Sequence, residues 1–260
     1  LLRPDSSIKK NYIMNPSGVA FLDDEAKEAV ERARSQVAAC LDCAAEEIIF
    51  TSGGSESDNL ALRGVVASRG GGHVVTSAVE HPAVLEVFRF LESQGFSTTI
   101  VPVDGAGRVD PATVADAFTD ETILVSVMHA NNEVGTLQPV AEIARACRER
   151  GVPIHTDAAQ AVGKMPVRVG ELGVDLLTVA GHKFYGPKGV GALYIRRGIR
   201  IDRLIHGASH ERGRRAGTEN VLGLVGLGAA AELACKQLET RVEHMRRLRD
   251  LLHEGLVERV

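Results

Sequence analysis

The stretch VPIHTDAAQAVGKMPVRVGELGVDLLTVAGHKFYGPKGVGALYI, residues 152–195, decides the fold of this chain. It holds two short apolar runs, 152–154 and 176–179, in a segment rich in Gly and Pro. Runs of this length and setting predict buried β-strands rather than helices. The first run leads to Asp157 and the second leads to Lys183. If both strands are parallel, their carboxyl ends lie at one edge of the sheet, which is where ligands bind in open α/β folds.

The two strand ends would bring four polar side chains to one crevice: Asp157, Gln160, His182 and Lys183. A lysine, a carboxylate and an amide suit a pyridoxal phosphate site, because the lysine amine forms a Schiff base and the carboxylate partners the pyridinium nitrogen. Taken singly, each residue also has a plain structural explanation. A lysine in a Gly-rich turn is usually a solvated surface residue, and an aspartate at a strand end often caps a helix.

The combination of motifs resembles a known family. The segments HTDAAQAVGK (155–164) and GHKFYGPKGVGALY (181–194) are similar to the class V aminotransferases, and within them to the cysteine desulfurases and selenocysteine lyases. The similarity continues through FTSGGSESDNL, SAVEHPAV, MHANNEVG and HERGRRAGTEN, in the family's order. Together these blocks cover nearly the whole chain from about residue 15 onward, which makes the match far more specific than any single motif.

Strands alternate with helices over residues 47–195, and this alternation predicts a parallel, three-layer α/β sheet. The resemblance implies the type I pyridoxal-phosphate-dependent transferase fold, with a large domain built on a mostly parallel seven-stranded sheet between helices. It divides the chain into a partial N-terminal segment (1–24), a cofactor-binding large domain (25–235) and a helix (236–260). We expect this helix to lead to a small C-terminal domain that the chain lacks, and the Asn-Pro-Ser turn at 15–17 to match the start of the family's pattern.

A predicted strand, a Gly-Gly turn and a predicted helix follow one another around Gly54 and Ser55. Such a turn presents free backbone N–H groups and the positive end of a helix dipole to a phosphate. The plain alternative is a helix capped by Ser55, with Glu56 in its first turn. The resemblance implies that Gly54 and Ser55 bind the cofactor phosphate. It also implies that Thr218, in a loop that crosses a dimer interface, contacts the phosphate bound to the neighbouring subunit.

Two further polar residues follow predicted strands. By itself, His81 suggests a polar helix cap and Asn132 suggests a turn residue. The resemblance implies that His81 stacks on the pyridine ring and acts as an acid/base, to which a flat imidazole that titrates near neutrality is suited. It also implies that Asn132 reaches the phenolic oxygen of the cofactor and the substrate carboxylate, that Gln160 acts at the same oxygen, and that Lys183 is the second catalytic residue.

The function implied by the resemblance is that of a pyridoxal-phosphate-dependent cysteine desulfurase. Such an enzyme converts L-cysteine to L-alanine and leaves the sulfur as an enzyme persulfide, for iron–sulfur cluster or other sulfur-transfer pathways. The alternatives are a selenocysteine lyase, which releases selenide from L-selenocysteine, another class V enzyme, or a fragment without catalytic activity. The implied partners are a second copy of the chain in a homodimer and sulfur-acceptor or scaffold proteins.

Two features depart from the family's pattern. Ala180 stands where the family often has a phosphate-binding Ser, so one hydrogen bond worth about 1.5–3 kcal/mol must come from elsewhere or is missing. The family's nucleophilic Cys loop and the Arg that clamps the substrate carboxylate would follow Val260. We therefore expect the 260-residue chain to bind the cofactor weakly and not to turn over by itself.

Composition excludes several other functions. A formal net charge of −4 and a pI near 6.2 give no basic footprint for nucleic acid. No apolar run approaches the length of a membrane span, and the first residues do not form a signal peptide. We expect a cytoplasmic protein, or an organellar one if a transit peptide has been lost, with no membrane partner and no metal site.

The chain has four cysteines: Cys40, Cys43, Cys147 and Cys235. The first two have CxxC spacing but end a helical pattern without a preceding strand, so they do not fit a thioredoxin-like redox motif. A second pair of ligands for zinc is not evident. We therefore assign all four cysteines to packing or to the surface.

Overall fold

The computed structural model describes residues 22–259 and builds them around one seven-stranded sheet in the order β1-β7-β6-β5-β4-β2-β3. The predicted turn at 15–17 and most of the predicted N-terminal segment lie outside the described residues. The strands are β1 (Ile48–Thr51), β2 (His73–Ser77), β3 (Ser97–Val101), β4 (Thr122–Ser126), β5 (Ile154–Asp157), β6 (Leu176–Ala180) and β7 (Gly191–Ile195). The strand expected at 152–154 is instead β5, which begins at Ile154 and ends at Asp157.

Most neighbours in the sheet are parallel, as the sequence predicts. The pairs β3–β2, β2–β4, β4–β5 and β5–β6 are parallel, whereas β7 runs antiparallel to both β6 and β1. Only residues 181–190 connect β6 to β7, and this connection is too short for the crossover that a parallel pair needs. Because β1 is reversed relative to β7, it regains the direction of the parallel strands, so its carboxyl end lies at the same edge as theirs.

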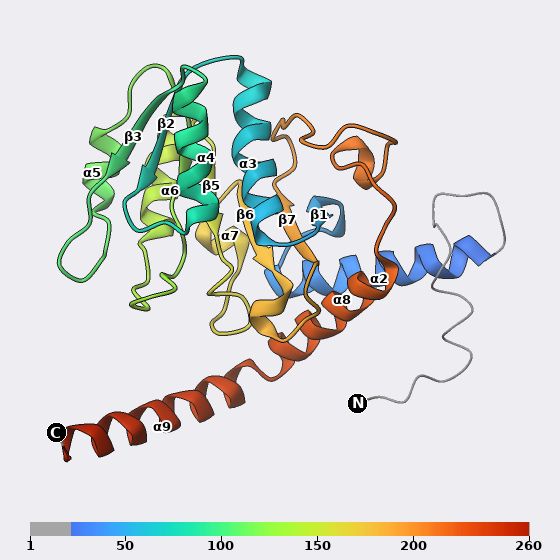
Figure 1. The fold of residues 1–260 in the computed structure, drawn as a ribbon, viewed down its shortest axis with the longest axis vertical. Coiled ribbons are helices and arrows are strands. Elements are labelled where there is room, and N and C mark those ends of the chain that lie inside the picture. The colour runs from blue at the N-terminus through green and yellow to red at the C-terminus, as the bar shows by residue number, and fades with distance from the viewer. Residues whose placement is uncertain (1–21, 260) are drawn as a thin grey trace.

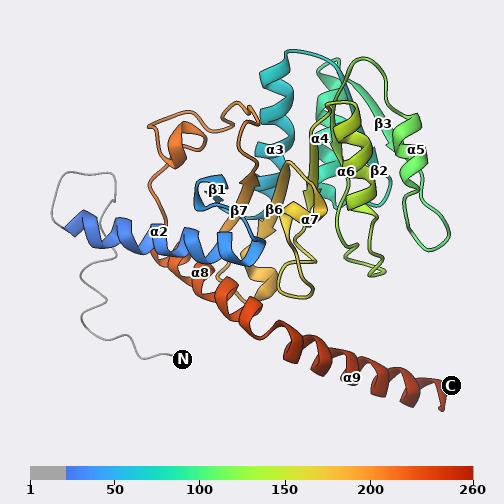
Figure 2. The same ribbon diagram turned by 180° about the vertical axis from the view of Figure 1, so that it is seen from behind.

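Helices cover both faces of the sheet (Figures 1 and 2). They are α2 (Leu22–Leu41), α3 (Gly54–Arg69), α4 (Pro82–Ser93), α5 (Pro111–Asp116), α6 (Val140–Glu149), α7 (Val169–Leu172), α8 (Val221–Lys236) and α9 (Leu238–Val257), with short 3-10 helices η1 (Ala45–Glu47), η2 (Gly181–Phe184) and η3 (Glu211–Gly213). One apolar core packs α3 and α4 on one face, and a larger core packs α2, α5, α6 and α8 on the other.

Side chains alternate between these two cores along each strand, as the pleat of a β-sheet requires. In β7, Leu193 and Ile195 contribute to the core under α3 and α4, whereas Ala192 and Tyr194 contribute to the opposite core. Because both faces are covered, the strand interiors read as continuous apolar runs. This explains why short apolar runs were sufficient to locate most strands in the sequence.

The pairing of α2 with α8 corrects the assignment of the cysteines. Cys40, in the last turn of α2, forms a disulfide with Cys235 in α8, across a sequence separation of 195 residues. Cys43 and Cys147 are free thiols, and the latter is buried. The prediction that all four cysteines serve packing or the surface is therefore wrong for Cys40 and Cys235, because sequence spacing does not show that the two helices lie side by side.

Two forked ion pairs help to hold the loop between β7 and α8 to the body. Arg34 of α2 donates from Nη1 and Nη2 to the two carboxylate oxygens of Glu211, at 2.7 and 2.9 Å, and both side chains are buried. Glu211 also accepts from the backbone N–H of Phe50 at 2.8 Å. Arg215 forms a second forked pair with Glu56 in the first turn of α3. Forked guanidinium–carboxylate pairs fix geometry as well as charge, so the loop is tied to the start of α3.

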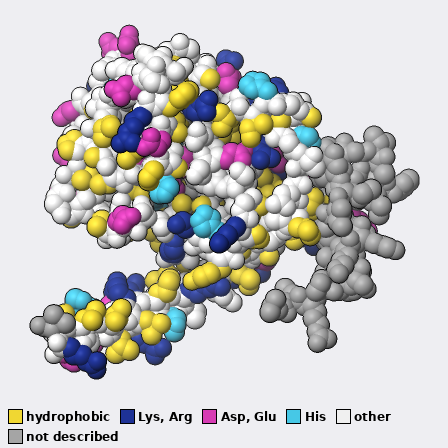
Figure 3. All heavy atoms as spheres, in the orientation of Figure 1, with side chains coloured by type: hydrophobic (Ala, Val, Ile, Leu, Met, Phe, Trp, Pro, Cys, Tyr) yellow, Lys and Arg dark blue, Asp and Glu magenta, His cyan; other side chains and the backbone are white. Residues whose placement is uncertain are grey.

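The last helix, α9, projects away from the body, and none of its residues is buried (Figure 3). It meets α8 at a bend of 72°, next to the predicted domain boundary at residue 235. Among the described residues, no single helix is long and apolar enough to cross a membrane. Taken together, α8 and α9 have the length and composition of a membrane span, but they are bent at their junction and neither helix meets these criteria alone.

Candidate active site

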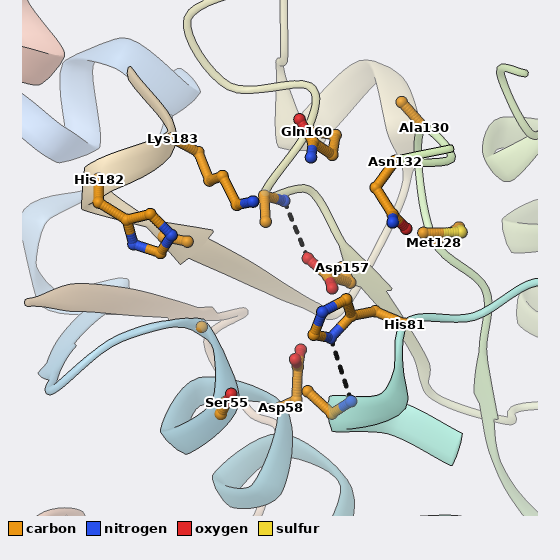
Figure 4. Close-up of a pocket in the computed structure, with 14 residues that line it drawn as sticks. Ser55, Asp58, His81, Met128, Ala130, Asn132, Asp157, Gln160, His182 and Lys183 are labelled. Atoms are coloured by element: carbon orange, nitrogen blue, oxygen red, sulfur yellow. Dashed lines mark hydrogen bonds between the residues drawn. The ribbon is translucent and has the colours of Figure 1, made fainter. Parts of the chain in front are cut away.

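The carboxyl ends of β1, β2, β4, β5 and β6 surround a cavity of about 310 Å³ (Figure 4). Its lining comes from the segments that directly follow these strands: Gly54, Ser55, Asp58, His81, Ala83, Met128, Ala130, Asn132, Asp157, Ala159, Gln160, Ala180, His182 and Lys183. The structure thus brings together every residue predicted to bind the cofactor except Thr218. That residue is exposed in the loop before α8 and does not line the cavity.

The turn from β1 into α3 forms one wall of the cavity. Gly53 adopts φ +148°, which favours glycine, and α3 begins at Gly54 without a side-chain cap. A Cβ atom on Gly54 would lie 3.3 Å from the Cβ of Ala180, so the backbone approaches β6 closely there. The carboxylate of Glu56 turns away, because it accepts from the backbone N–H of Ser52 and pairs with Arg215. Glu56 therefore does not occupy the N-terminal end of α3, and the acid that this helix contributes to the cavity lining is Asp58, one turn later.

Asp157 lies at the end of β5 with only 6% of its surface exposed. Its Oδ1 accepts a hydrogen bond from the backbone N–H of Ala159 at 2.9 Å. Burial raises the pKa of Asp157, while that hydrogen bond and the charges of His81 and Lys183 oppose the rise. A carboxylate in this setting interacts strongly with any cation placed beside it, because little water screens its charge.

Lys183 is held out from the end of β6 by the short helix η2. The neighbouring Phe184 is buried and anchors this helix, while His182 and Lys183 stay exposed. A Cβ on Gly181 would lie 2.8 Å from Leu227 of α8, so the helix packs closely against α8. Burial and the nearby charges of three lysines, among them Lys183, lower the pKa of His182. The turn thus presents a cluster of basic groups to the cavity.

His81 joins the cavity to α4. It is the N-cap residue of that helix, and its Nδ1 accepts a hydrogen bond from the backbone N–H of Ala83 at 3.1 Å. Pro82 at the first helical position favours the start of the helix there. The ring points into the cavity (Figure 4). The side chain of His81 therefore caps α4 and also lines the cavity.

Two amides complete the lining. Asn132 is exposed and donates to the carboxylate of Glu133 at 3.0 Å. The Oε1 atom of Gln160 accepts from Nζ of Lys164 at 2.7 Å. Sequence reasoning missed Lys164, whose pKa is lowered by burial and by the charge of Lys183. Residues 160–164 form a turn with Gly163 at φ +76° rather than a helix, so no helical spacing in the sequence indicated this contact.

Sequence reasoning also missed a group of buried polar residues beneath the cavity. Asp58 lines its floor, Glu80 lies next to His81 in the chain, and His155 lies in β5 with no exposed surface. Ring nitrogens of His155 contact Ser126 and Thr178 at 2.9 and 3.0 Å, and burial lowers its pKa to about 3. A signal was present for Asp58: it follows Gly54 by four residues and so shares its face of α3.

This donor set fits pyridoxal phosphate. The start of α3 at Gly54 offers backbone N–H groups to a phosphate, Asp157 offers a buried carboxylate to a pyridinium nitrogen, and Lys183 offers an amine for covalent attachment. Neither Gly53 nor Gly54 has a side chain, and α3 has no side-chain cap, so no capping side chain occupies the N–H groups at the helix start. The flat ring of His81 lies in the same cavity.

Comparison with known proteins agrees with this geometry. The profile of the family described as Aminotransferase class-V matches residues 7–259. The chain is 50% identical over 253 residues to cysteine desulfurase IscS of Dictyoglomus turgidum, covering 96% of this chain and 64% of the relative. It is also 50% identical over 246 residues to cysteine desulfurase IscS of Methanosarcina thermophila, covering 94% of this chain and 61% of the relative. The chain therefore spans less than two thirds of the length of these relatives.

Solved structures lead to the same family. A NifS-like protein superposes with a TM-score of 0.93 at 39% identity, over 99% of this chain and 73% of the other. A structure described as SspA in complex with cysteine superposes with a TM-score of 0.84 at 39% identity, over 87% and 67% of the two chains. With the family profile spanning nearly all of the residues, the chain belongs to the aminotransferase class-V family.

Proposed function

We propose that this chain is the cofactor-binding part of a pyridoxal-phosphate-dependent cysteine desulfurase. The observation that carries the proposal is the meeting of Lys183, Asp157 and the start of α3 in one cavity. It is supported by the 50% identity to proteins named cysteine desulfurase. The structural neighbour described in complex with cysteine favours L-cysteine over L-selenocysteine as the substrate.

When bound, pyridoxal phosphate supplies an electron-withdrawing ring that stabilises negative charge on the substrate. The amine of Lys183 would hold the cofactor covalently and, when free, would take the proton from the substrate Cα. Asp157 would hold a proton on the ring nitrogen, which its buried carboxylate favours. The start of α3 at Gly54 and Ser55 would hold the phosphate.

The remaining polar groups orient the reactants. With the cofactor bound, His81 would stack on its ring and would move a proton at the substrate. Gln160, itself held by Lys164, would direct its amide toward the phenolic oxygen. Asn132 would contact the same oxygen and the substrate carboxylate. The net reaction is balanced: L-cysteine and an acceptor thiol give L-alanine and a persulfide on that thiol.

The proposal includes a homodimer and a sulfur-acceptor or scaffold protein. Thr218 lies outside the cavity of its own chain and is exposed, so it is available to the phosphate of a neighbouring subunit. The ion pair between Arg215 and Glu56 supports this role, because it fixes the loop of Thr218 to α3. Thr218→Ala is expected to weaken cofactor binding in the dimer and to leave a monomer unaffected.

The experiment is a spectroscopic titration of the chain with pyridoxal phosphate, followed by addition of amino acids. We expect a visible absorption band that L-cysteine perturbs and that L-aspartate leaves unchanged. Because L-cysteine also reacts with the free cofactor, Lys183→Ala protein is the reference. Formation of L-alanine in the presence of an added thiol completes the test. A spectral response to L-aspartate with transfer of its amino group would instead identify a transaminase.

A further inference from the structure

Asp58 is a buried acid in the floor of the cavity. It lies in α3, one turn after the proposed phosphate cradle, and only 1% of its surface is exposed. In Figure 4 the carboxyl groups of Asp58 and Asp157 both point toward the ring of His81, from opposite sides. The floor thus contains two buried carboxyl groups that share one small space.

Among residues 22–259, Asp58 has no ion pair with a lysine or an arginine. Its Oδ1 has no hydrogen-bond partner among these residues, and Nε2 of His155 lies 3.6 Å from it. That imidazole contacts Ser126 and Thr178 through its two nitrogens, and it is wholly buried. A buried ring that titrates near pH 3 stays neutral at physiological pH, so it does not form an ion pair with Asp58.

The other groups that act on Asp58 are two carboxyl groups and a hydroxyl group. Asp157 of β5 disfavours a charge on Asp58, and so does Glu80 when it is ionised, whereas Thr178 of β6 offers one hydrogen bond. Burial and these neighbours raise the pKa of Asp58 well above its usual range. Like-charged carboxyl groups at close range do not both ionise in a buried site, and one of them keeps a proton.

Asp157 is the better place for the negative charge. It accepts from the backbone N–H of Ala159, and the charge of Lys183 acts on it. Among the described residues, Asp58 has one hydrogen bond, from Thr178, and no lysine acts on it. We propose that Asp58 is a positioning residue of this site: it is a neutral carboxylic acid at physiological pH and leaves the negative charge of the floor on Asp157 alone.

The consequence for the cofactor rests on the proposed function. A neutral Asp58 keeps a second negative charge out of the cavity floor. Such a charge would compete with Asp157 for the proton of the ring nitrogen and for the positive side chains of the site. It acts through Asp157 and needs no contact with the cofactor. An asparagine has the same shape and is neutral at every pH, so it is expected to substitute for Asp58, whereas it cannot substitute for Asp157.

The first measurement uses the protein without cofactor, labelled with carbon-13 at aspartate carboxyl groups. Infrared and NMR spectra at pH 7 are expected to contain one protonated carboxyl signal, which is missing in Asp58→Asn and kept in the surface control Asp120→Asn. The wild-type spectrum alone suffices if the variant does not fold. A spectrum in which every aspartate is ionised at pH 7 overturns the proposal.

The second measurement follows bound pyridoxal phosphate by its visible spectrum. Asp58→Asn is expected to bind within about threefold of the wild-type affinity with an unchanged spectrum and pH profile, whereas Asp157→Asn changes both. Equal disturbance by the two substitutions would show that Asp58 also carries charge, and would overturn the proposal. If the wild-type chain bound no cofactor at all, the proposed function would fail while the carboxyl spectra would still decide the state of Asp58.

Discussion

The Nδ1 atom of His81 accepts a hydrogen bond from the backbone N–H of Ala83 at 3.1 Å, so the residue that faces the cavity is also the N-cap of α4. A neutral imidazole that accepts at Nδ1 carries its proton on Nε2. The second nitrogen is then a donor within the cavity. The position of this donor is set by the start of a helix, which is among the more rigid supports that a protein offers.

This dual role predicts different effects for two substitutions at His81. An asparagine oxygen can cap the helix, whereas alanine cannot, so His81→Ala is expected to lower the free energy of unfolding by about 1 kcal/mol and His81→Asn by much less. Both are expected to abolish most of the L-alanine formation from L-cysteine that an added thiol supports. Urea unfolding and alanine formation, measured side by side, separate the two roles. Normal turnover of His81→Asn would limit this residue to capping.

Lys183 is expected to be the site of covalent attachment. Borohydride treatment of the cofactor-loaded chain should fix pyridoxal phosphate to one peptide containing Lys183, and Lys183→Ala should abolish this labelling. Lys188→Ala is the matched control, because that lysine is exposed in the same connection and does not line the cavity. Peptide mass spectrometry reads the result. Undiminished labelling of the Lys183→Ala protein would mean that another amine holds the cofactor.

Glu80 is expected to make stability depend on pH. It is buried, Oε1 accepts from Ser77 and from the backbone of Met128, and burial raises its pKa to about 8. The folded chain therefore keeps a proton that the unfolded chain releases above pH 4.5. The stability contributed by that proton is complete at low pH and is lost as pH rises toward 8.

The variant Glu80→Gln removes this titration. Between pH 5 and pH 8 its free energy of unfolding should fall less steeply than that of the wild type, by up to about 1.4 kcal/mol per pH unit. Glu86→Gln, an exposed position on α4, is the control. Urea unfolding at several pH values gives the slopes. Parallel slopes for Glu80→Gln and the wild type would show that Glu80 is ionised in the folded chain.

The motifs predicted the gathering of residues at the sheet edge because each follows a strand, and parallel strands end together. The direction of β7 could not be obtained in the same way. An apolar run has the same appearance in either direction, and only the short connection after Lys183 distinguishes them. The neutral state proposed for Asp58 also depends on neighbours from other strands, and a linear motif does not contain them.

The disulfide was hidden for a related reason: Cys40 and Cys235 meet only because α2 packs on α8. Thiol titration of the unfolded chain without reductant should find the two free thiols Cys43 and Cys147, and all four after reduction. Closing so long a loop is expected to stabilise the chain by about 2–4 kcal/mol.

Reduction should therefore lower the melting temperature of the wild type and leave the melting temperature of the double variant Cys40→Ser/Cys235→Ser unchanged. The single variant Cys43→Ser should respond to reductant as the wild type does, since its thiol is not in the disulfide. Four reactive thiols in the unreduced chain would contradict the pairing.

Ala180 is expected to limit how tightly the phosphate binds. It lines the cavity beside Gly54, where the family often has a serine, and its side chain has no hydrogen-bond donor. Ala180→Ser adds a hydroxyl group at the proposed cradle, and a hydrogen bond to a charged acceptor contributes about 1.5–3 kcal/mol. Binding of pyridoxal phosphate should tighten by about tenfold or more.

The control Ala159→Ser adds the same group elsewhere in the cavity lining and should leave the affinity nearly unchanged. Gly54→Ala, which places a Cβ 3.3 Å from that of Ala180, should weaken binding. Equal affinities for the wild type and Ala180→Ser, measured by absorbance titration, would place the phosphate away from the start of α3.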